Sequence, residues 1–305
     1  MKKILITGSN GLIGQELCKK INKSYIIKKF DNKLPVQSYS YGDILVPEIL
    51  QESIKDCDGI VHLAAFSRVI FGEKNPKRCW ETNVTGTYNI LNLAYQSKKK
   101  PWVLYASSRE VYGQQKKFPV KESARLKPLN IYANSKLLAE KLVEKYKKKG
   151  LQTAILRFSN VYGRINDHPD RVVPAFCLSA VHGTPIHIEG ESNIFDFTHI
   201  TDVVEAISKV IIFLEKRKKI PIMHITSGIP VSLKNLAELI KKYSIHKTKI
   251  IIDPPRSFDV SKFYGDNSLI KKVLDWSPKI DLQTGIKLLI KDFMDKSKSN
   301  NKDNK

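Results

Sequence analysis

Short apolar runs rich in β-branched residues alternate along the chain with longer segments whose apolar residues recur at helical spacing. The apolar runs are 3–7, 25–30, 59–64, 101–107 and 153–158. The helical spacing is clearest over 84–95 and 138–146. Strands that alternate with helices indicate parallel βαβ units with right-handed crossovers. We therefore predict an α/β protein of the Rossmann type, with a doubly wound parallel sheet.

The regular alternation ends near residue 165. Residues 166–195 are rich in Pro, Gly and Asn, which predicts loops, and 229–295 is mainly helical in pattern. We assign both segments to a smaller C-terminal substrate-binding lobe. Residues 1–165 form the predicted Rossmann domain, and 196–228 returns to its sheet. The polar, low-complexity residues 296–305 predict a disordered tail.

The chain of 305 residues has a formal charge of +22, which raises the question of nucleic-acid binding. The excess is mostly Lys, in short runs at 98–100, 147–149 and 216–219. These runs fall at predicted helix ends and loops, and aromatic residues do not interleave with them as they do on base-stacking surfaces. We expect no nucleic-acid partner, although a diffuse positive field can steer an anionic substrate.

Membrane insertion and metal binding find no support in the sequence. No run of 18 or more apolar residues exists, and the N-terminus carries no signal-peptide pattern. The four cysteines are scattered, with no CxxC pair and no metal-ligand spacing. We expect reduced thiols, no metal and a cytoplasmic protein.

A glycine-rich turn follows the first predicted strand. Gly8, Gly11 and Gly14 lie between that strand and a predicted helix. Without Cβ atoms, they permit a tight bend and the close approach of a pyrophosphate to a helix N-terminus. Because a strand and a helix flank the glycines, the turn predicts a dinucleotide site. The other residues that we place in this part of the site are Asn10, Leu12 and Ile13.

The end of the second predicted strand indicates which dinucleotide is bound. Asp31, followed by Asn32, can accept hydrogen bonds from the adenosine ribose hydroxyls and would repel a 2′-phosphate. NAD is therefore favoured, although Lys33 is a nearby cation of the kind that accommodates NADP. Asp43, beside Ile44, is a candidate partner for the adenine amino group, or alternatively the N-cap of a helix.

The third main strand ends in His62, Leu63, Ala64 and Ala65. Small residues at a strand end let the backbone pass close to a cofactor. We interpret His62 as a core histidine with satisfied hydrogen bonds, and we place the other three residues at the cofactor.

Tyr132 and Lys136 are four residues apart, so both project from one face of a helix. A free tyrosine has a pKa near 10, and a neighbouring cation stabilises its phenolate. Ser108 follows a predicted strand at the edge of the sheet where ligands bind, and its hydroxyl can link a substrate oxygen to Tyr132. These three residues predict a proton path for hydride transfer, with Ser107 in a structural role.

Seven segments occur in an order typical of one superfamily. They are TGSNGLIG (7–14), HLAA (62–65), NVTGT (83–87), SSREVYG (107–113), YANSK (132–136), LRFSNVYG (156–163) and FDFTHITD (195–202). The chain resembles the extended short-chain dehydrogenase/reductases, and among them the nucleotide-sugar epimerases and dehydratases typified by UDP-galactose 4-epimerase. The resemblance spans roughly residues 3–293.

The resemblance implies roles for individual residues. Tyr132 is the base, Lys136 its partner and Ser108 the ligand of the substrate hydroxyl. Arg256 resembles an arginine that clamps the substrate diphosphate, a task that suits a guanidinium. Three further residues are placed at NAD: Asn83, Phe158 and Ser159. The remaining candidates for substrate contact are Ser67, Arg68, Arg109, Glu110, Asn160, Arg171 and Val173.

Three departures from the family pattern matter. Arg109-Glu110 replaces the Asp-Glu pair of sugar 4,6-dehydratases, which argues against dehydration while leaving Glu110 as a possible base. Phe195 stands where many relatives carry an arginine, so one diphosphate contact is missing and the nucleotide stays open. Arg68 lies where relatives differ by substrate, and it faces either the sugar or solvent.

The resemblance favours a 4-epimerase that acts on a nucleotide-diphosphate sugar with bound NAD. A 4-dehydrogenase, a 4-ketoreductase and, less favoured, a 4,6-dehydratase need the same initial chemistry. A non-catalytic NAD-binding regulator is the alternative of another class, and the retention of Tyr132, Lys136 and Arg256 argues against it. Relatives pair the two helices around 84–95 and 137–146, so we expect a homodimer through a four-helix bundle. Synthesis of surface polysaccharide precursors is a further expectation from the resemblance.

Overall fold

The computed structural model describes residues 1–35, 37–38 and 40–302. Its centre is a six-stranded parallel sheet in the order β10-β5-β4-β3-β1-β2. The strands are β1 (Lys3–Thr7), β2 (Ile26–Phe30), β3 (Gly59–His62), β4 (Trp102–Ser108), β5 (Thr153–Phe158) and β10 (Met223–Ile225). The order of the strands reverses beside β1, and a ligand crevice is expected at the carboxyl ends of the strands there.

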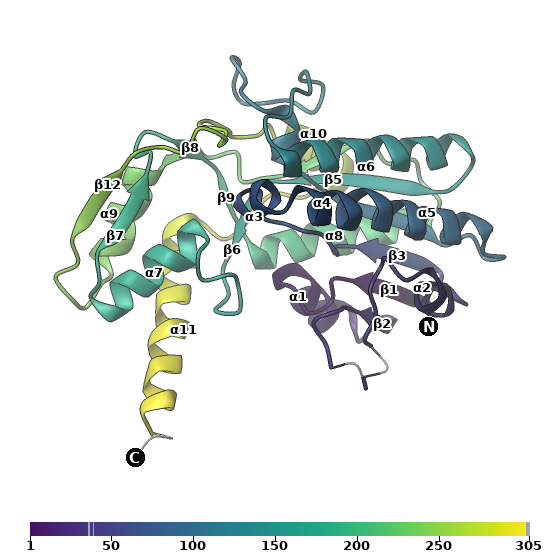
Figure 1. The fold of residues 1–305 in the computed structure, drawn as a ribbon, viewed down its shortest axis with the longest axis horizontal. Coiled ribbons are helices and arrows are strands. Elements are labelled where there is room, and N and C mark those ends of the chain that lie inside the picture. The colour runs from purple at the N-terminus through teal and green to yellow at the C-terminus, as the bar shows by residue number, and fades with distance from the viewer. Residues whose placement is uncertain (36, 39, 303–305) are drawn as a thin grey trace.

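Helices cover both faces of the sheet (Figure 1). They are α1 (Leu12–Ile21), α2 (Pro47–Ile54), α5 (Gly86–Gln96), α6 (Ile131–Lys148) and α8 (Ile200–Glu215). Ile4 and Ile6 of β1 pack with α1 and α8, whereas Leu5 packs with α2, α5 and α6. Both sides of β1, β3, β4 and β5 are therefore buried, which explains why the sequence shows continuous apolar runs there instead of alternation, whereas the edge strand β2 is largely exposed.

A second, smaller layer of structure lies beside the carboxyl ends of the strands (Figure 1). Its elements are α7 (Val172–His182), β7 (Ile186–Glu189), β8 (Ile194–Phe195), β11 (Val231–Ser232), α9 (Leu233–Lys242), β12 (Ile250–Asp253) and α11 (Leu282–Lys302). These elements enclose a separate apolar core that includes Phe176, Ile188, Leu236, Leu289 and Phe293. A wall opposite the cofactor-binding strands is thereby formed.

Short elements connect the two layers. They are α3 (Val69–Lys74), α4 (Pro76–Trp80), the π-helical turn η1 (Glu81–Thr85), the 3-10 turn η2 (Arg109–Tyr112), β6 (Asn160–Tyr162), β9 (Phe197–His199) and α10 (Ser268–Leu274). β6 pairs with β9 in parallel. No helix in the described part of the chain is long and apolar enough to cross a membrane.

Three local predictions differ from the structure. Residues 172–182 form α7 where loops were predicted, because Pro174 lies in the first helical turn, where proline is tolerated. Residues 250–253 form β12 in a segment predicted as mainly helical, since they pair with the distant β7. α11 continues to Lys302 across most of the predicted disordered tail, as an extension of an amphipathic helix. Residues 303–305 of that prediction lie outside the described residues.

Candidate active site

A cavity of about 800 Å³ lies at the carboxyl ends of β1, β3, β4 and β5, between the sheet and the smaller layer. With one exception, every residue that the sequence placed in the site lines this cavity. On the cofactor side they are Gly8, Asn10, Gly11, Leu12, Ile13, Gly14, Asp31, Asn32, Asp43, Ile44, Leu63, Ala64, Ala65, Tyr132, Lys136, Phe158 and Ser159. On the substrate side they are Ser67, Arg68, Ser108, Arg109, Glu110, Asn160, Arg171, Val173 and Arg256.

The glycine turn is built for the close approach of backbone segments. Gly8 has a φ of +70°, and a Cβ there would lie 2.6 Å from the backbone nitrogen of Ala64. A Cβ on Gly14 would lie 2.2 Å from the carbonyl oxygen of Gly8. By contrast, a Cβ on Gly11 would meet only that carbonyl oxygen, at 3.3 Å. Gly11 is the N-cap of α1 and faces the cavity, so the turn fits a dinucleotide pyrophosphate at the helix N-terminus.

Gly11 and Gly14 therefore differ in what alanine should do. In Gly14→Ala the turn must open, so we expect a lower melting temperature, through an overpacking cost of about 1–3 kcal/mol, together with weaker NAD binding. In Gly11→Ala the melting temperature should stay near that of the wild type while NAD affinity falls about tenfold or more, because the methyl group meets the pyrophosphate. Calorimetric NAD titration and thermal melts check both variants. A folded Gly11→Ala protein with wild-type NAD affinity would contradict this placement.

The acids at the adenosine end are held by the backbone. The Asp31 carboxylate accepts hydrogen bonds from the backbone N–H of Asn10 at 2.8 Å and of Lys33 at 2.9 Å. Asp43 accepts from the Asn32 side chain at 3.0 Å and from the backbone N–H of Leu45 at 2.9 Å. Asp43 does not cap α2, whose N-cap is Val46, and it also pairs with Arg78 at 3.2 Å at the cavity wall.

Ser108, Tyr132 and Lys136 come together at the floor of the cavity, where β4 meets α6. All three are buried, with exposed fractions of 8%, 8% and 3%. The Ser108 hydroxyl lines the cavity with Tyr132 and accepts from the backbone N–H of Glu110 at 3.2 Å. The Lys136 ammonium donates to the carbonyl oxygen of Ala106 at 2.8 Å and lies 6.0 Å from the centroid of the Tyr132 ring.

Burial acts on the pKa values of both titratable groups. It raises the pKa of Tyr132 to about 12, while the polar side chain of Ser108 lowers it and the negative charge of Glu110 raises it. Burial also lowers the pKa of Lys136 to about 8. Because both groups are shielded from water, a further charge placed near them changes the pKa values of the phenol and the ammonium strongly. Such a pair is suited to moving one proton to and from a ligand.

Asn83 is the exception, because it does not line the cavity. Its side chain is 1% exposed. It accepts from the backbone N–H of Phe66 at 2.8 Å and donates to the hydroxyl of Ser135 at 2.9 Å. Asn83 thus fastens the loop after β3 to α6 from behind the site, within the wide turn η1. This geometry gives Asn83 a positioning role at the cavity wall, and its direct contact with the cofactor stays a prediction.

His62 is a core histidine, as the sequence indicated. Its two ring nitrogens pair with the hydroxyls of Thr7 at 2.8 Å and Thr87 at 3.0 Å. Ser107 is likewise structural, since its hydroxyl donates to Glu140 at 2.5 Å.

Buried histidines should make the fold sensitive to acid. Burial lowers the pKa of His62 to about 3 and those of His199 and His224 to about 4. The unfolded chain therefore binds more protons, and stability present above pH 6.5 is lost as the pH falls toward 4. Three carboxyl groups oppose part of this loss, because burial raises the pKa values of Glu122 and Asp202 and raises that of Asp196 to about 6.

We expect the free energy of unfolding to fall by at least ~2 kcal/mol between pH 7 and pH 5. Urea unfolding at the two values measures it. His224→Gln should weaken the pH dependence, whereas the same change at the exposed His182 should leave it intact. A stability that does not change with pH would refute the assignment.

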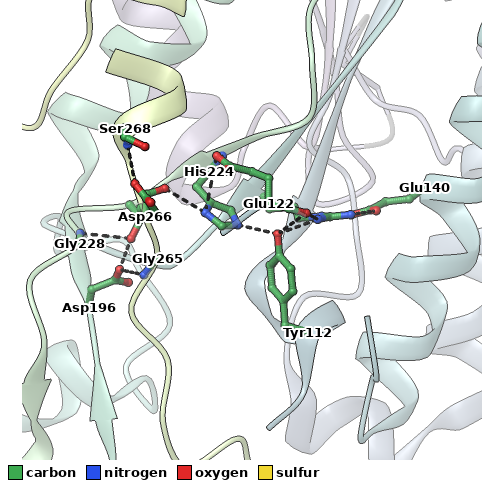
Figure 2. A network of polar contacts seen from close by, with 11 residues as sticks. Tyr112, Glu122, Glu140, Asp196, His224, Gly228, Gly265, Asp266 and Ser268 are labelled. Carbon is green, nitrogen blue, oxygen red and sulfur yellow. Dashed lines mark hydrogen bonds and ion pairs between the residues drawn. The ribbon is translucent and has the colours of Figure 1, made fainter. Parts of the chain in front are cut away.

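A buried polar network, which the sequence did not predict, includes Tyr112, Glu140 and His224 (Figure 2). Arg157 of β5 binds Glu140 of α6 through two hydrogen bonds of 2.9 and 2.7 Å. Arg157 also donates to the hydroxyl of Tyr112 at 2.6 Å, and that hydroxyl pairs with His224 at 2.6 Å. The network joins α6, η2, β5 and β10. Two signals could have revealed it: Glu140 lies one helical turn beyond Lys136, and Arg157 interrupts an apolar strand.

The basic residues on the substrate side each have an acidic neighbour. Arg68 pairs with Asp170 at 2.5 Å and so lies against the cavity wall, not free in solvent. Arg171 pairs with Asp167 at 3.3 Å. Arg256 binds Asp259 at 2.8 Å. Asn160 donates to the backbone carbonyl of Asp196 at 3.2 Å.

Residues 4–225 match the NAD dependent epimerase/dehydratase family. The chain belongs to this family. The resemblance predicted from the motifs is therefore confirmed, and the protein is an NAD-dependent enzyme with a Rossmann-type fold. The glycine turn and the Asp31 carboxylate at the cavity fit this cofactor.

Individual members of the family resemble the chain over nearly its whole length. A putative UDP-glucose 4-epimerase of Methanocaldococcus jannaschii is 31% identical over 303 residues, 94% of this chain and 97% of the relative. UDP-glucuronic acid decarboxylase 6 of Arabidopsis thaliana is 28% identical over 309 residues, 95% and 88% of the two chains. The crystal structure of UDP-glucose 4-epimerase from Thermotoga maritima with UDP-glucose is 26% identical, with a TM-score of 0.88 over 97% of this chain and 99% of that one.

Proposed function

We propose that this family member is a nucleotide-sugar 4-epimerase that works through a 4-keto sugar. The observation that carries the proposal is the group Ser108, Tyr132 and Lys136 on the floor of one cavity, whose walls hold the glycine turn and Arg256. A site of this composition suits a ligand with a diphosphate at one end and a sugar at the other. The names of the M. jannaschii relative and the T. maritima structure support epimerisation.

In this proposal Tyr132 takes the proton of the sugar C4 hydroxyl. Ser108, which lines the cavity with Tyr132, holds the substrate oxygen in line with it. NAD, when bound, accepts the C4 hydride and returns it, and its positive ring favours the phenolate. The Lys136 ammonium lies 6.0 Å from the centroid of the Tyr132 ring, and a positive charge this close favours the phenolate. A turn of the 4-keto sugar in the cavity lets Tyr132 return the proton to the opposite epimer.

Arg109 at the cavity wall supports epimerisation over dehydration. Elimination of a 6-hydroxyl needs an acid to protonate the leaving oxygen, and a guanidinium cannot supply that proton because it stays charged at all physiological pH values. Glu110 is the acid that remains nearby, and it is paired with Arg109 at 2.9 Å.

Mass spectrometry of the purified protein with UDP-, GDP-, CDP- and dTDP-sugars tests the reaction, together with absorbance at the reduced-nicotinamide band. A product isomeric with its substrate, without accumulating NADH, is expected. A product lighter by two hydrogens with NADH accumulating would replace epimerase by 4-dehydrogenase, and loss of water would indicate a dehydratase.

We also propose a homodimer through α5 and α6. Tyr88 of α5 is 45% exposed, and Trp80, which ends the preceding α4, is 42% exposed. An interface would remove these apolar rings from water. Light scattering should give about twice the chain mass, and a monomer at micromolar concentration would overturn the dimer.

A cytoplasmic location belongs to the same proposal and agrees with four buried, free cysteines.

A further inference from the structure

Arg109 is the first residue after β4 and holds an unusual place in the cavity wall. It is 8% exposed. Its guanidinium carbon lies 4.5 Å from the centroid of the Phe195 ring and 5.6 Å from that of Phe263. Two aromatic rings therefore fix the position of a charged group that is nearly shielded from water.

The hydrogen bonding of this guanidinium is incomplete. Nη2 pairs with Glu110 at 2.9 Å, but Nη1 is enclosed and has no acceptor among the described residues. Asp196 is fully buried, and its Oδ2 binds Gly265 and Thr226. Its Oδ1 has no hydrogen-bond partner among the described residues, and the charge of Arg109 acts to lower the pKa of Asp196 although the two side chains form no ion pair. A buried charged donor without an acceptor is costly, so an acceptor supplied by a ligand would be strongly favoured.

The location of Arg109 indicates which part of a sugar meets it. Ser108, its neighbour in the chain, lines the same cavity as Tyr132, and the Ser108 hydroxyl oxygen accepts from the backbone N–H of Glu110, the ion-pair partner of Arg109, at 3.2 Å. Tyr132 marks C4 of the sugar in the proposed function. The ring carbons beside C4 are C3, which carries a hydroxyl, and C5, which carries the exocyclic C6. Of these substituents, C6 is the one that forms a carboxylate when it is oxidised.

We propose that Arg109 binds a carboxylate at C6, so that the preferred substrate is a nucleoside-diphosphate uronic acid. This inference rests on the proposed function and adds the class of sugar to it. Carboxylate and guanidinium match in charge and in planar geometry, which a neutral 6-hydroxyl does not. Because Nη1 is enclosed, we expect binding to need a small rotation of the guanidinium between Phe195 and Phe263.

The experiment compares UDP-glucuronic acid with UDP-glucose, which differ only at C6. Calorimetry and steady-state kinetics on the NAD-loaded full-length protein give a dissociation constant and a kcat/KM for each sugar. For the wild type we expect UDP-glucuronic acid to bind about 10- to 100-fold more tightly, as a charged hydrogen bond implies. Arg109→Gln should lose that factor for UDP-glucuronic acid and leave the affinity for UDP-glucose within about threefold.

Further variants separate recognition from structure. Arg109→Lys keeps the positive charge but cannot form the planar guanidinium–carboxylate pair. It should retain part of the preference for UDP-glucuronic acid over UDP-glucose. If Arg109→Gln fails to fold because the Glu110 carboxylate is left buried without its partner, the double variant Arg109→Gln with Glu110→Gln removes that charge and takes its place. Arg125→Gln, at an exposed arginine outside the cavity, is the control and should match the wild type.

The outcomes distinguish this inference from the proposed function. Turnover of UDP-glucose at least equal to that of UDP-glucuronic acid, or an equal loss for both sugars in Arg109→Gln, overturns the role of Arg109 and leaves the epimerase standing. Preferred binding of UDP-glucuronic acid with loss of CO₂ supports Arg109 and overturns the epimerase. If neither sugar binds, the inference fails and the epimerase proposal depends on the other nucleotides.

Discussion

Replacing Tyr132 by phenylalanine is expected to lower turnover by about 10²- to 10⁴-fold, the range typical of a lost general acid–base group. The ring keeps its packing, because only the hydroxyl is removed. NAD and nucleotide-sugar affinities should therefore change little. Product formation under saturating substrate, together with the NAD content of the purified protein, measures the effect.

The matched control is Tyr264→Phe. Tyr264 stacks on Phe118, with ring centroids 5.1 Å apart, and does not line the cavity. It should retain wild-type turnover. If Tyr132→Phe kept more than about one tenth of wild-type activity, the proton would have to pass through another group, and the proposed chemistry would be wrong.

Breaking the Arg157–Glu140 pair is expected to have the largest effect on stability. The two side chains are 3% and 4% exposed. Arg157→Met leaves the Glu140 carboxylate buried without its charged partner, which costs roughly 3–5 kcal/mol. For a chain of this size the melting temperature should fall by roughly 5–8 °C, as measured by calorimetry. Because Glu140 belongs to the helix of Tyr132 and Lys136, turnover should fall as well.

Two further variants test this explanation. Arg157→Met combined with Glu140→Leu removes both charges, so much of the lost stability should return. Lys147→Met breaks the pair with Glu144 on the outer side of the same helix, where each side chain is 38% exposed, and should cost less than about 1 kcal/mol. If Arg157→Met and the double variant with Glu140→Leu lost the same amount of stability, packing and not the buried charge would be the cause.

The chemistry of the site was accessible to sequence reasoning because it depends on local geometry. A strand that runs into Gly8, Gly11 and Gly14 needs only its neighbours to form the turn. Tyr132 and Lys136 share a helix face by spacing alone. The inner strands of the main sheet, β1, β3, β4 and β5, were visible as apolar runs because both of their faces are buried.

Non-local contacts were out of reach of the same reasoning. β12 is a strand because β7, far away in the chain, offers it hydrogen bonds. Asn83 belongs to a sequence motif at the cofactor, yet the fold turns its side chain toward Phe66 and Ser135. Glu140, Arg157, Tyr112 and His224 come from four elements, and only the packed sheet brings them together.

By itself, the sequence determined the fold class and the cofactor of this protein, and it predicted the proton-transfer group, since these follow from the pattern of adjacent elements and from spacing within them. The tertiary structure decided which polar residues face the cavity and which support it from behind. It also placed Arg109 between Phe195 and Phe263, an arrangement that joins three distant segments. Burial and the completion of hydrogen bonds are properties of the whole packed chain, and they assign each side chain its role.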